Sequence, residues 1–172
     1  LVDGAMGELS PAQVKALGAM NRNGERLVGL VDNLLTLAGL TSDSFGWERD
    51  RVDVVAVVRA TRDAVAPLLV DRDLEITYDL PSDAVAVGGD LGQLTLMLTN
   101  LLSNAVKFTE DGGHVTVCLS SDADAALLTV TDDGLGIPED EQQHLFGRFW
   151  RSSTSVTRHI QGTGLGLATV QA

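Results

Sequence analysis

Residues 91–108 read LGQLTLMLTNLLSNAVKF, and this stretch carries the clearest helical pattern in the chain. Its apolar side chains recur at steps of three and four, which places them along one face of a helix. They are Leu91, Leu94, Leu98, Leu101, Leu102 and Ala105. The pattern predicts a helix from Asp90 to Phe108 that packs one face on a hydrophobic core.

The same stretch carries three polar residues, Asn100, Asn104 and Lys107, at steps of four and three, so they share another face of the helix. An amide oxygen is a hard ligand for Mg²⁺, and an ammonium group pairs with a phosphate. This face therefore suits a magnesium–phosphate site. A solvated outer surface explains the same pattern.

Segments on either side alternate between helical and extended patterns. Helices are predicted at residues 53–70, at 138–145 and from Gly164 onward, whereas residues 151–161 are polar and irregular. Strands are predicted at residues 74–80, 84–87, 115–119 and 126–131. Because helices and antiparallel strands come in separate runs, the predicted class is α+β, a sheet with helices on one face.

The N-terminal part has a different pattern. Ser10 and Pro11 form a typical helix start. Residues 11–40 then show two adjacent apolar seams, which suit a helix bundle in which each helix contacts two neighbours. An amphipathic helix packed on the domain's own core is the alternative. Residues 41–50 are polar and rich in turn formers, as in a linker.

The composition limits the partners. With 24 Asp and Glu against 12 Lys and Arg, the 172-residue chain has a net charge of −12, which disfavours binding to nucleic acids and anionic membranes. The single cysteine, Cys118, excludes an internal disulfide framework and a cysteine-based zinc site. Since no apolar run approaches the ~20 residues of a membrane span and no signal peptide is visible, we expect a soluble, cytoplasmic chain without membrane contact.

Two further segments are rich in glycine. Residues 131–138, TDDGLGIP, follow a predicted strand; their glycines allow close backbone approach, and the Asp132 carboxylate can accept a hydrogen bond from an exocyclic amine. Residues 162–168, GTGLGLA, put glycines at a helix start, where free amides can bind an anion. Their spacing fits neither a Rossmann nor a Walker loop. Alone, each segment is also explained as an ordinary glycine turn.

In this order and at these separations, the segments resemble the catalytic, ATP-binding domain of the sensor histidine kinases of two-component systems. That domain belongs to the superfamily of gyrase, Hsp90, histidine kinase and MutL ATPases, which has the Bergerat α/β sandwich fold with a mixed, mainly antiparallel sheet. The resembling segments are the N box at 100–108, the G1 box at 132–136, the F box at 145–150 (LFGRFW) and the G2 box at 162–166.

The resemblance implies two parts. Residues 53–172 are similar to the catalytic domain, and we expect this domain to be shortened at the C-terminus because the family's final strand pair is absent from the sequence. Residues 1–45 resemble part of the dimerisation domain, without its phosphoacceptor histidine. The resemblance therefore implies a helix-bundle dimer through residues 11–40.

The resemblance also implies roles for the residues of the boxes. Asp132 reads the adenine amino group, and Phe108 helps to wall the adenine. Asn104 holds Mg²⁺, Lys107 contacts a phosphate, and Asn100 lies beside the metal and the phosphates.

Further implied roles fall on the loops. Gly134 and Gly136 hinge a nucleotide lid at about residues 138–163, and Arg151 or Arg158 of this lid reaches the phosphates. The implied phosphate cradle is Gly162, Thr163, Gly164, Leu165 and Gly166. The implied cofactors are ATP and Mg²⁺.

The residue at position 100 helps to separate a kinase from an ATPase. Hydrolysing members of the superfamily have a glutamate there, which activates water. An amide has no basicity near neutral pH and cannot be that general base. Asn100 therefore favours transfer to a protein over hydrolysis.

The phosphoacceptor is expected outside the chain. His114, His144 and His159 all lack the sequence context of the family's acceptor histidine. The chain is thus either a fragment or the catalytic half of a split kinase, with an aspartate on a response regulator as the later recipient. Two alternatives stay open: an anti-sigma-type serine/threonine kinase of the same superfamily, and a degenerate, non-enzymatic nucleotide-binding or dimerisation module.

Overall fold

The computed structural model describes residues 50–158, 160 and 162–171, together with residues 10, 12–14, 16–18, 20 and 24. The chain divides into two compact units, Leu1–Ser42 and Asp43–Ala172. In the first unit the Ser10 hydroxyl accepts a hydrogen bond from the N–H of Gln13 at 3.3 Å, as an N-cap does, and the described residues that follow are helical. The rest of the predicted helix at 11–40 lies outside the described residues, as does the predicted linker at 41–50 apart from Asp50, which is extended.

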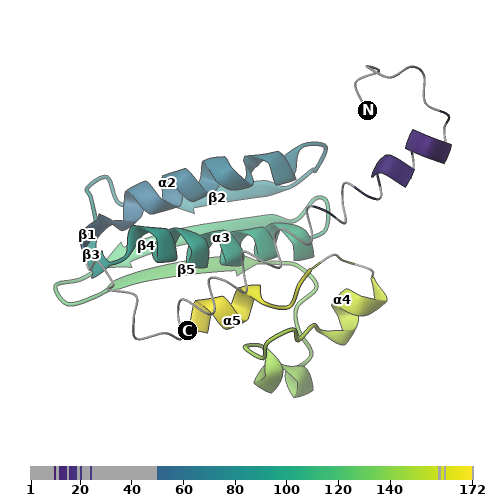
Figure 1. Cartoon of the computed structure of the whole chain (residues 1–172). Coiled ribbons are helices and arrows are strands. Elements are labelled where there is room, and N and C mark those ends of the chain that lie inside the picture. Colours follow the sequence, from purple (N-terminus) through teal and green to yellow (C-terminus); the bar gives the residue numbers. More distant parts are fainter. Residues whose placement is uncertain are drawn as a thin grey trace. The chain divides into compact units, whose positions relative to one another are not determined.

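The second unit has the predicted α+β architecture (Figure 1). Its main sheet has the order β2–β4–β5, in which β2 (Glu75–Asp79) pairs parallel with β4 (His114–Ser121), and β4 pairs antiparallel with β5 (Ala126–Asp132). A separate antiparallel pair is formed by β1 (Asp50–Asp53) and β3 (Ala86–Gly89).

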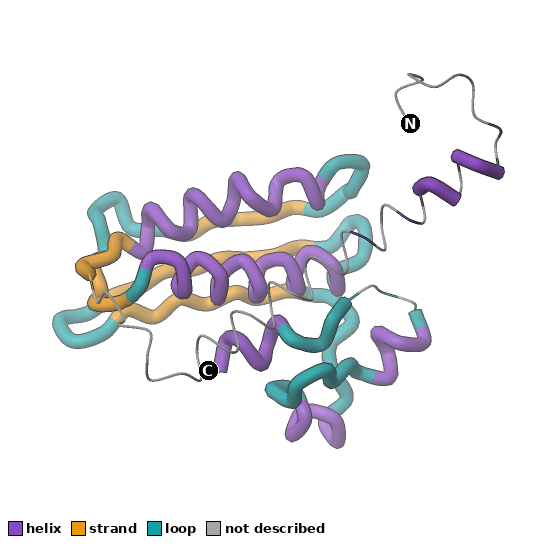
Figure 2. The backbone as a smooth tube through the Cα atoms, viewed as in Figure 1, coloured by secondary structure: helices purple, strands orange, loops and turns teal. Residues whose placement is uncertain are grey.

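Helices cover one face of the main sheet (Figure 2). They are α2 (Val54–Val65), which continues into the 3₁₀ turn η1 (Ala66–Leu69), and α3 (Leu91–Phe108). The short helix α5 (Gly166–Gln171) packs beside α3. None of the helices among the described residues combines the length and hydrophobicity needed to cross a bilayer.

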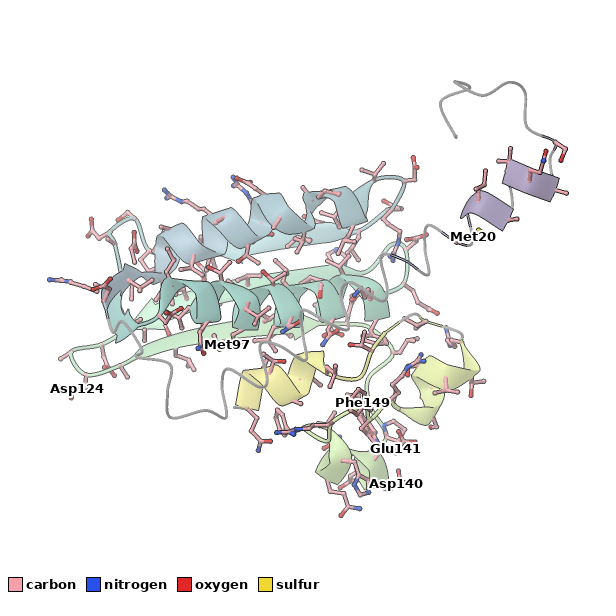
Figure 3. The ribbon with its side chains drawn as sticks, in the orientation of Figure 1. Met20, Met97, Asp124, Asp140, Glu141 and Phe149 are labelled. Atoms are coloured by element: carbon pink, nitrogen blue, oxygen red, sulfur yellow. The ribbon has the colours of Figure 1, made fainter. Side chains whose placement is uncertain are left out.

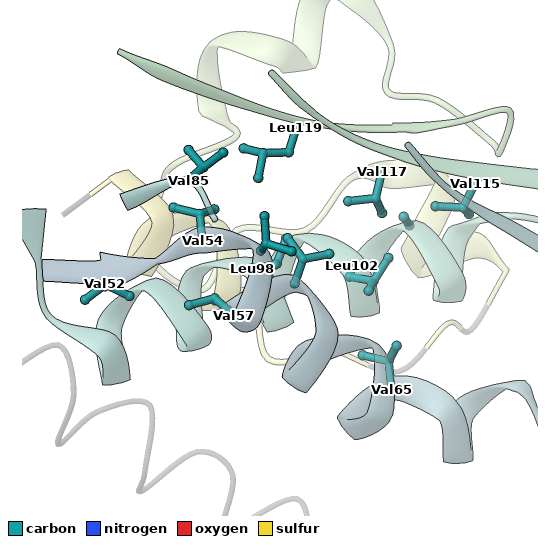
Figure 4. Packing of buried hydrophobic residues seen from close by; sticks show 13 residues of the cluster. Val52, Val54, Val57, Val65, Val85, Leu98, Leu102, Val115, Val117 and Leu119 are labelled. Atoms are coloured by element: carbon teal, nitrogen blue, oxygen red, sulfur yellow. The ribbon is translucent and has the colours of Figure 1, made fainter. Parts of the chain in front are cut away.

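The core between the helices and the sheet is aliphatic (Figure 4). Strand β4 alternates as predicted, and its buried Val115, Val117 and Leu119 face Leu98 and Leu102 of α3. Burial of these side chains fixes α3 on the sheet and so fixes the position of its polar residues.

The sequence pattern missed one helix. Residues 151–161, predicted to be irregular, contain α4 (Ser153–Thr157). The Ser152 hydroxyl accepts a hydrogen bond from the N–H of Ser155 at 3.2 Å, so a side-chain cap starts the helix. Serine and threonine have modest helix propensity, which is why the apolar pattern gave no signal.

Other boundaries also differ from the prediction. The segment predicted as a helix at 138–145 is a 3₁₀ helix, η2 (Glu139–His144), with no buried residue to extend it by packing. The strand predicted at 84–87 is found two residues later, as β3. Strand β1 was not predicted, because only Val52 in it is both apolar and buried.

Candidate functional site

The polar face of α3 lies beside the last glycine-rich segment. The side chain of Asn100 lies against Gly166, where a Cβ atom would stand 3.2 Å from the amide oxygen of Asn100. The amide nitrogen of Asn100 is buried and has no hydrogen-bond partner among the described residues. The structure therefore brings the N box and the G2 box together, as a shared site requires.

One helical turn further, Asn104 is half-buried, and Lys107 and Phe108 line an open groove at the C-terminal end of α3. The groove has a volume of about 380 Å³. Its lining residues are Arg72, Lys107, Phe108, Thr109, Glu110, Asp111, Leu135, Arg158 and Ile160. Partial desolvation of the ammonium lowers the pKa of Lys107. Lys107 forms no ion pair with the described residues, so its charge is available to an anion in the groove.

The G1 box is fixed against the end of α3. The N–H of Leu135 donates to the carbonyl oxygen of Phe108 at 3.0 Å. A Cβ atom on Gly134 would overlap that carbonyl group, at 2.8 Å from its carbon, so only glycine allows this approach. Gly136 follows with a φ of +61°, in the left-handed region. The two glycines thus have different tasks, close approach and a turn.

Asp132 ends β5 just before these glycines. Its carboxylate is exposed, and its Oδ1 atom accepts the N–H of Gly134 at 3.1 Å. Asp132 is not among the residues that line the groove at the end of α3. A short turn joins Asp132 to Leu135, which does line the groove.

The F box and the G2 box also meet. Gly164 has a φ of +72°, and a Cβ atom there would stand 2.5 Å from the backbone carbon of Phe149. Leu165 is fully buried, and its N–H donates to the Thr163 hydroxyl at 3.3 Å. Gly162 has open space around it. The contact at Gly164 therefore anchors the G2 box on the lid segment, in which Figure 3 labels Phe149.

The two lid arginines have different partners. Arg151 donates to the carbonyl oxygens of Ser155 and Ile160, within the lid itself. Arg158 forms an ion pair with Glu110 and lines the groove together with Lys107. Of these two, Arg158 is the one that the structure places beside the other candidate residues.

Sequence reasoning missed two partners at this site, Glu110 and Arg72. Arg72 pairs with Asp111, with 2.5 Å between Nε and Oδ1, and donates to the carbonyl oxygen of Thr109 at 2.8 Å. It thereby satisfies the end of α3, where helical carbonyls lack partners. Arg72 and Thr109 are 37 residues apart, so no local pattern could reveal the contact.

No group of three His, Cys, Asp or Glu side chains within the described part of the chain is arranged to hold a metal ion. The amide oxygens of Asn100 and Asn104 are hard donors on the polar face of α3. Mg²⁺ commonly uses one or two protein ligands, completed by phosphate oxygens and water. Asparagine donors on this face therefore fit an ion that is bound together with a phosphorylated ligand.

Comparisons with known proteins identify the family. Residues 89–172 match the family described as histidine kinase-, DNA gyrase B- and HSP90-like ATPases. The sensor histidine kinase RppB of Synechocystis sp. is 33% identical over 162 residues, which are 94% of this chain and 36% of RppB.

Solved structures give the same result. A structure of the mycobacterial sensor histidine kinase MprB has 34% identity and a TM-score of 0.60, over 72% of this chain and 76% of that chain. Full-length ShkA in complex with AMPPNP has 28% identity and a TM-score of 0.75, over 95% of this chain and 34% of that chain.

The chain spans about a third of the length of RppB. Its α+β fold agrees with the similarity to these solved structures. The chain belongs to the sensor histidine kinases, and residues 89–172 form its part of their ATP-binding domain.

Proposed function

We propose that this chain binds Mg·ATP along α3 and transfers the γ-phosphoryl group to a histidine on another segment or on a partner protein. The observation that carries the proposal is the groove at the end of α3. There Lys107, which has no ion-pair partner in the described part of the chain, lies together with the ring of Phe108 and the lid residue Arg158, next to the helix face that presents Asn104. The AMPPNP bound to the similar ShkA supports a nucleotide as the ligand.

The chemistry needs little more than these groups. Phosphoryl transfer depends on positioning and on neutralising the charge of the phosphates. Lys107 supplies a partly desolvated ammonium, and the amide oxygen of Asn104 would bind the Mg²⁺ that accompanies the nucleotide. Asn100 cannot act as a general base, which favours transfer to a protein side chain over hydrolysis.

The base of the nucleotide is assigned to the G1 box. An ionised carboxylate only accepts hydrogen bonds, so Asp132 would accept one from the adenine amino group. Phe108 would form one wall of the adenine site. Residues 162–166, which meet α3 at Asn100, would surround the phosphates.

The remaining partners follow from the family. The histidine-bearing acceptor would pass the phosphoryl group to an aspartate of a response regulator, and the reaction would take place in the cytoplasm. The predicted helix at residues 11–40 would form the dimeric bundle on which acceptor and catalytic parts meet.

The nucleotide assignment is tested by calorimetry with Mg·ATP on two neighbouring aspartates. Asp132→Asn should weaken binding tens-fold, because loss of one charge-assisted hydrogen bond is worth about 1.5–3 kcal/mol. Asp133→Asn makes the same change in charge, but its carboxylate bonds the N–H of His114, so it should bind like the parent. Equal affinity of both variants and the parent would refute the role of Asp132.

The transfer reaction is tested with γ-labelled ATP. The chain should label a histidine-bearing dimerisation segment, and the label should be lost in acid, because a phosphoramidate is acid-labile. Asn104→Asp should disturb transfer most at limiting Mg²⁺ while leaving the fold intact. Strong acid-stable labelling would indicate a serine or threonine kinase.

A further inference from the structure

We propose that Glu110 is a positioning residue that restrains the lid arginine Arg158 and that a nucleotide phosphate must displace it. This inference rests on the proposed nucleotide site and adds a competition step to it. In the structure, Arg158 is paired with Glu110. With nucleotide bound, the guanidinium would exchange the carboxylate for a phosphate in the same groove.

The carboxylate partner stands on the fixed side of the groove. Glu110 follows Thr109, which is buried and whose N–H donates to the carbonyl oxygen of Ala105 at 3.1 Å. The carbonyl oxygen of Glu110 accepts the N–H of Gly113 at 3.1 Å. The backbone of Glu110 is therefore tied to the end of α3, so the ion pair attaches the lid to the helix that carries Lys107.

Arg158 stands on the other side, directly after α4, and 48 residues separate it from Glu110. The side chains of the pair are 51% and 67% exposed for Arg158 and Glu110. Water therefore reaches both groups, and the ion pair can exchange its partner at little cost.

The other arginines near the groove are held more firmly. Arg72 has a carboxylate and two carbonyl oxygens as partners, and Arg151 has two carbonyl oxygens within the lid. Among the described residues, Arg158 has a single side-chain partner, Glu110. It is thus the groove arginine that an incoming phosphate can recruit most easily.

The competition predicts a selective effect on affinity. A ligand with phosphates must break the Arg158–Glu110 pair to gain Arg158, whereas adenosine has no need of it. Exposed ion pairs contribute little, so removal of the carboxylate should tighten Mg·ATP binding about two- to five-fold. The affinity for adenosine should not change.

Four proteins test the mechanism by calorimetry with Mg·ATP and by NMR titration with adenosine: the parent, Glu110→Gln, Arg158→Gln and the double variant. Glu110→Gln should bind Mg·ATP more tightly, and Arg158→Gln less tightly. In the Arg158→Gln background, Glu110→Gln should lose most of its effect. This non-additivity identifies a restraint that acts through Arg158.

A matched control separates the restraint on Arg158 from the general effect of removing one negative charge. Glu139→Gln removes the same charge from an exposed position in η2 that pairs with no described residue, and it should leave the affinity unchanged. Equal thermal unfolding midpoints would show that all variants are folded.

The outcomes distinguish this inference from the proposed function. A parent that fails to bind Mg·ATP refutes the nucleotide site itself. A parent that binds, with the same gain from Glu110→Gln in both backgrounds, shows simple repulsion between carboxylate and phosphate and overturns the restraint. Unchanged affinity of Glu110→Gln overturns it as well.

Discussion

The end of α3 and the lid are two sides of one groove, and they are built differently. On the side of α3, backbone contacts dominate: Gly134 packs on Phe108, and Arg72 binds the last carbonyls of the helix. On the lid side, Phe146 and Phe149 are 45% and 57% exposed, and the link across the groove is a solvent-exposed ion pair. A fixed helix end thus faces a segment that few buried contacts restrain.

The largest expected effect is a loss of stability from a substitution in α3, on the fixed side of the groove. Leu102 of α3 is fully buried against the sheet, so Leu102→Ala should cost about 2–5 kcal/mol of unfolding free energy. Phe146→Ala in the lid removes a larger side chain that is nearly half exposed and should cost at most about 1 kcal/mol. Urea unfolding of both variants measures the difference. Similar losses would mean that the lid is packed as firmly as the core.

A smaller effect is expected where the G1 box meets α3. Gly134→Ala places a Cβ atom against the backbone of Phe108, and relief of that overlap should cost about 1–3 kcal/mol. Gly162→Ala adds the same atom to open space and should change the stability by less than about 0.5 kcal/mol. Thermal unfolding of the two variants measures the contrast. Equal stability would contradict the tight contact between Gly134 and α3.

The smallest expected effect is a pH dependence of the stability, which comes from a contact at the start of β4. The N–H of His114 donates to Asp133 at 2.8 Å and lowers the pKa of this carboxyl group, with a smaller contribution from the His114 side chain. Because the pKa is lower in the folded state, the stabilisation is present above the ordinary pKa of about 3.9 and is lost as the pH falls below it.

Asp133→Asn should therefore flatten the fall in stability as the pH drops below about 4, where an unfolded aspartate takes up its proton before the folded one. Urea unfolding of the parent and the variant across this range measures the slope. At pH 7 the difference between the parent and the variant gives the change in unfolding free energy when the carboxylate is replaced. An unchanged slope would show that the contact with His114 does not survive in solution.

Apolar periodicity predicted the parts of the fold that burial determines. The places of α3, β4 and β5 in the chain follow from side chains such as Leu98, Val115 and Val117, which repeat at the spacing of their element, although β4 extends beyond the predicted residues 115–119. The polar face of α3 could be predicted for the same reason, because the helix period fixes Asn100, Asn104 and Lys107 relative to one another.

Contacts between distant segments could not be predicted in this way. The pairs Arg72–Asp111 and Arg158–Glu110 join residues 39 and 48 positions apart, and nothing local marks them. Helix α4 begins with a serine cap and has no apolar stripe. The sequence thus placed Asn100, Asn104 and Lys107 on one helix face, whereas the different partners of Arg151 and Arg158 became visible only in three dimensions.

The pairing of β4 has a consequence for how the domain folds. Its partner β5 follows through a tight turn in which the N–H of Asp122 donates to the carbonyl oxygen of Ala125 at 3.0 Å. Its other partner, β2, is distant in sequence: Asp79 and Cys118 face each other although 39 residues separate them. Closing such a loop costs more chain entropy than closing a hairpin, and contacts between distant residues slow folding. We therefore expect the hairpin β4–β5 to form before β2 pairs with β4, and this long-range pairing to limit the rate at which the sheet is completed.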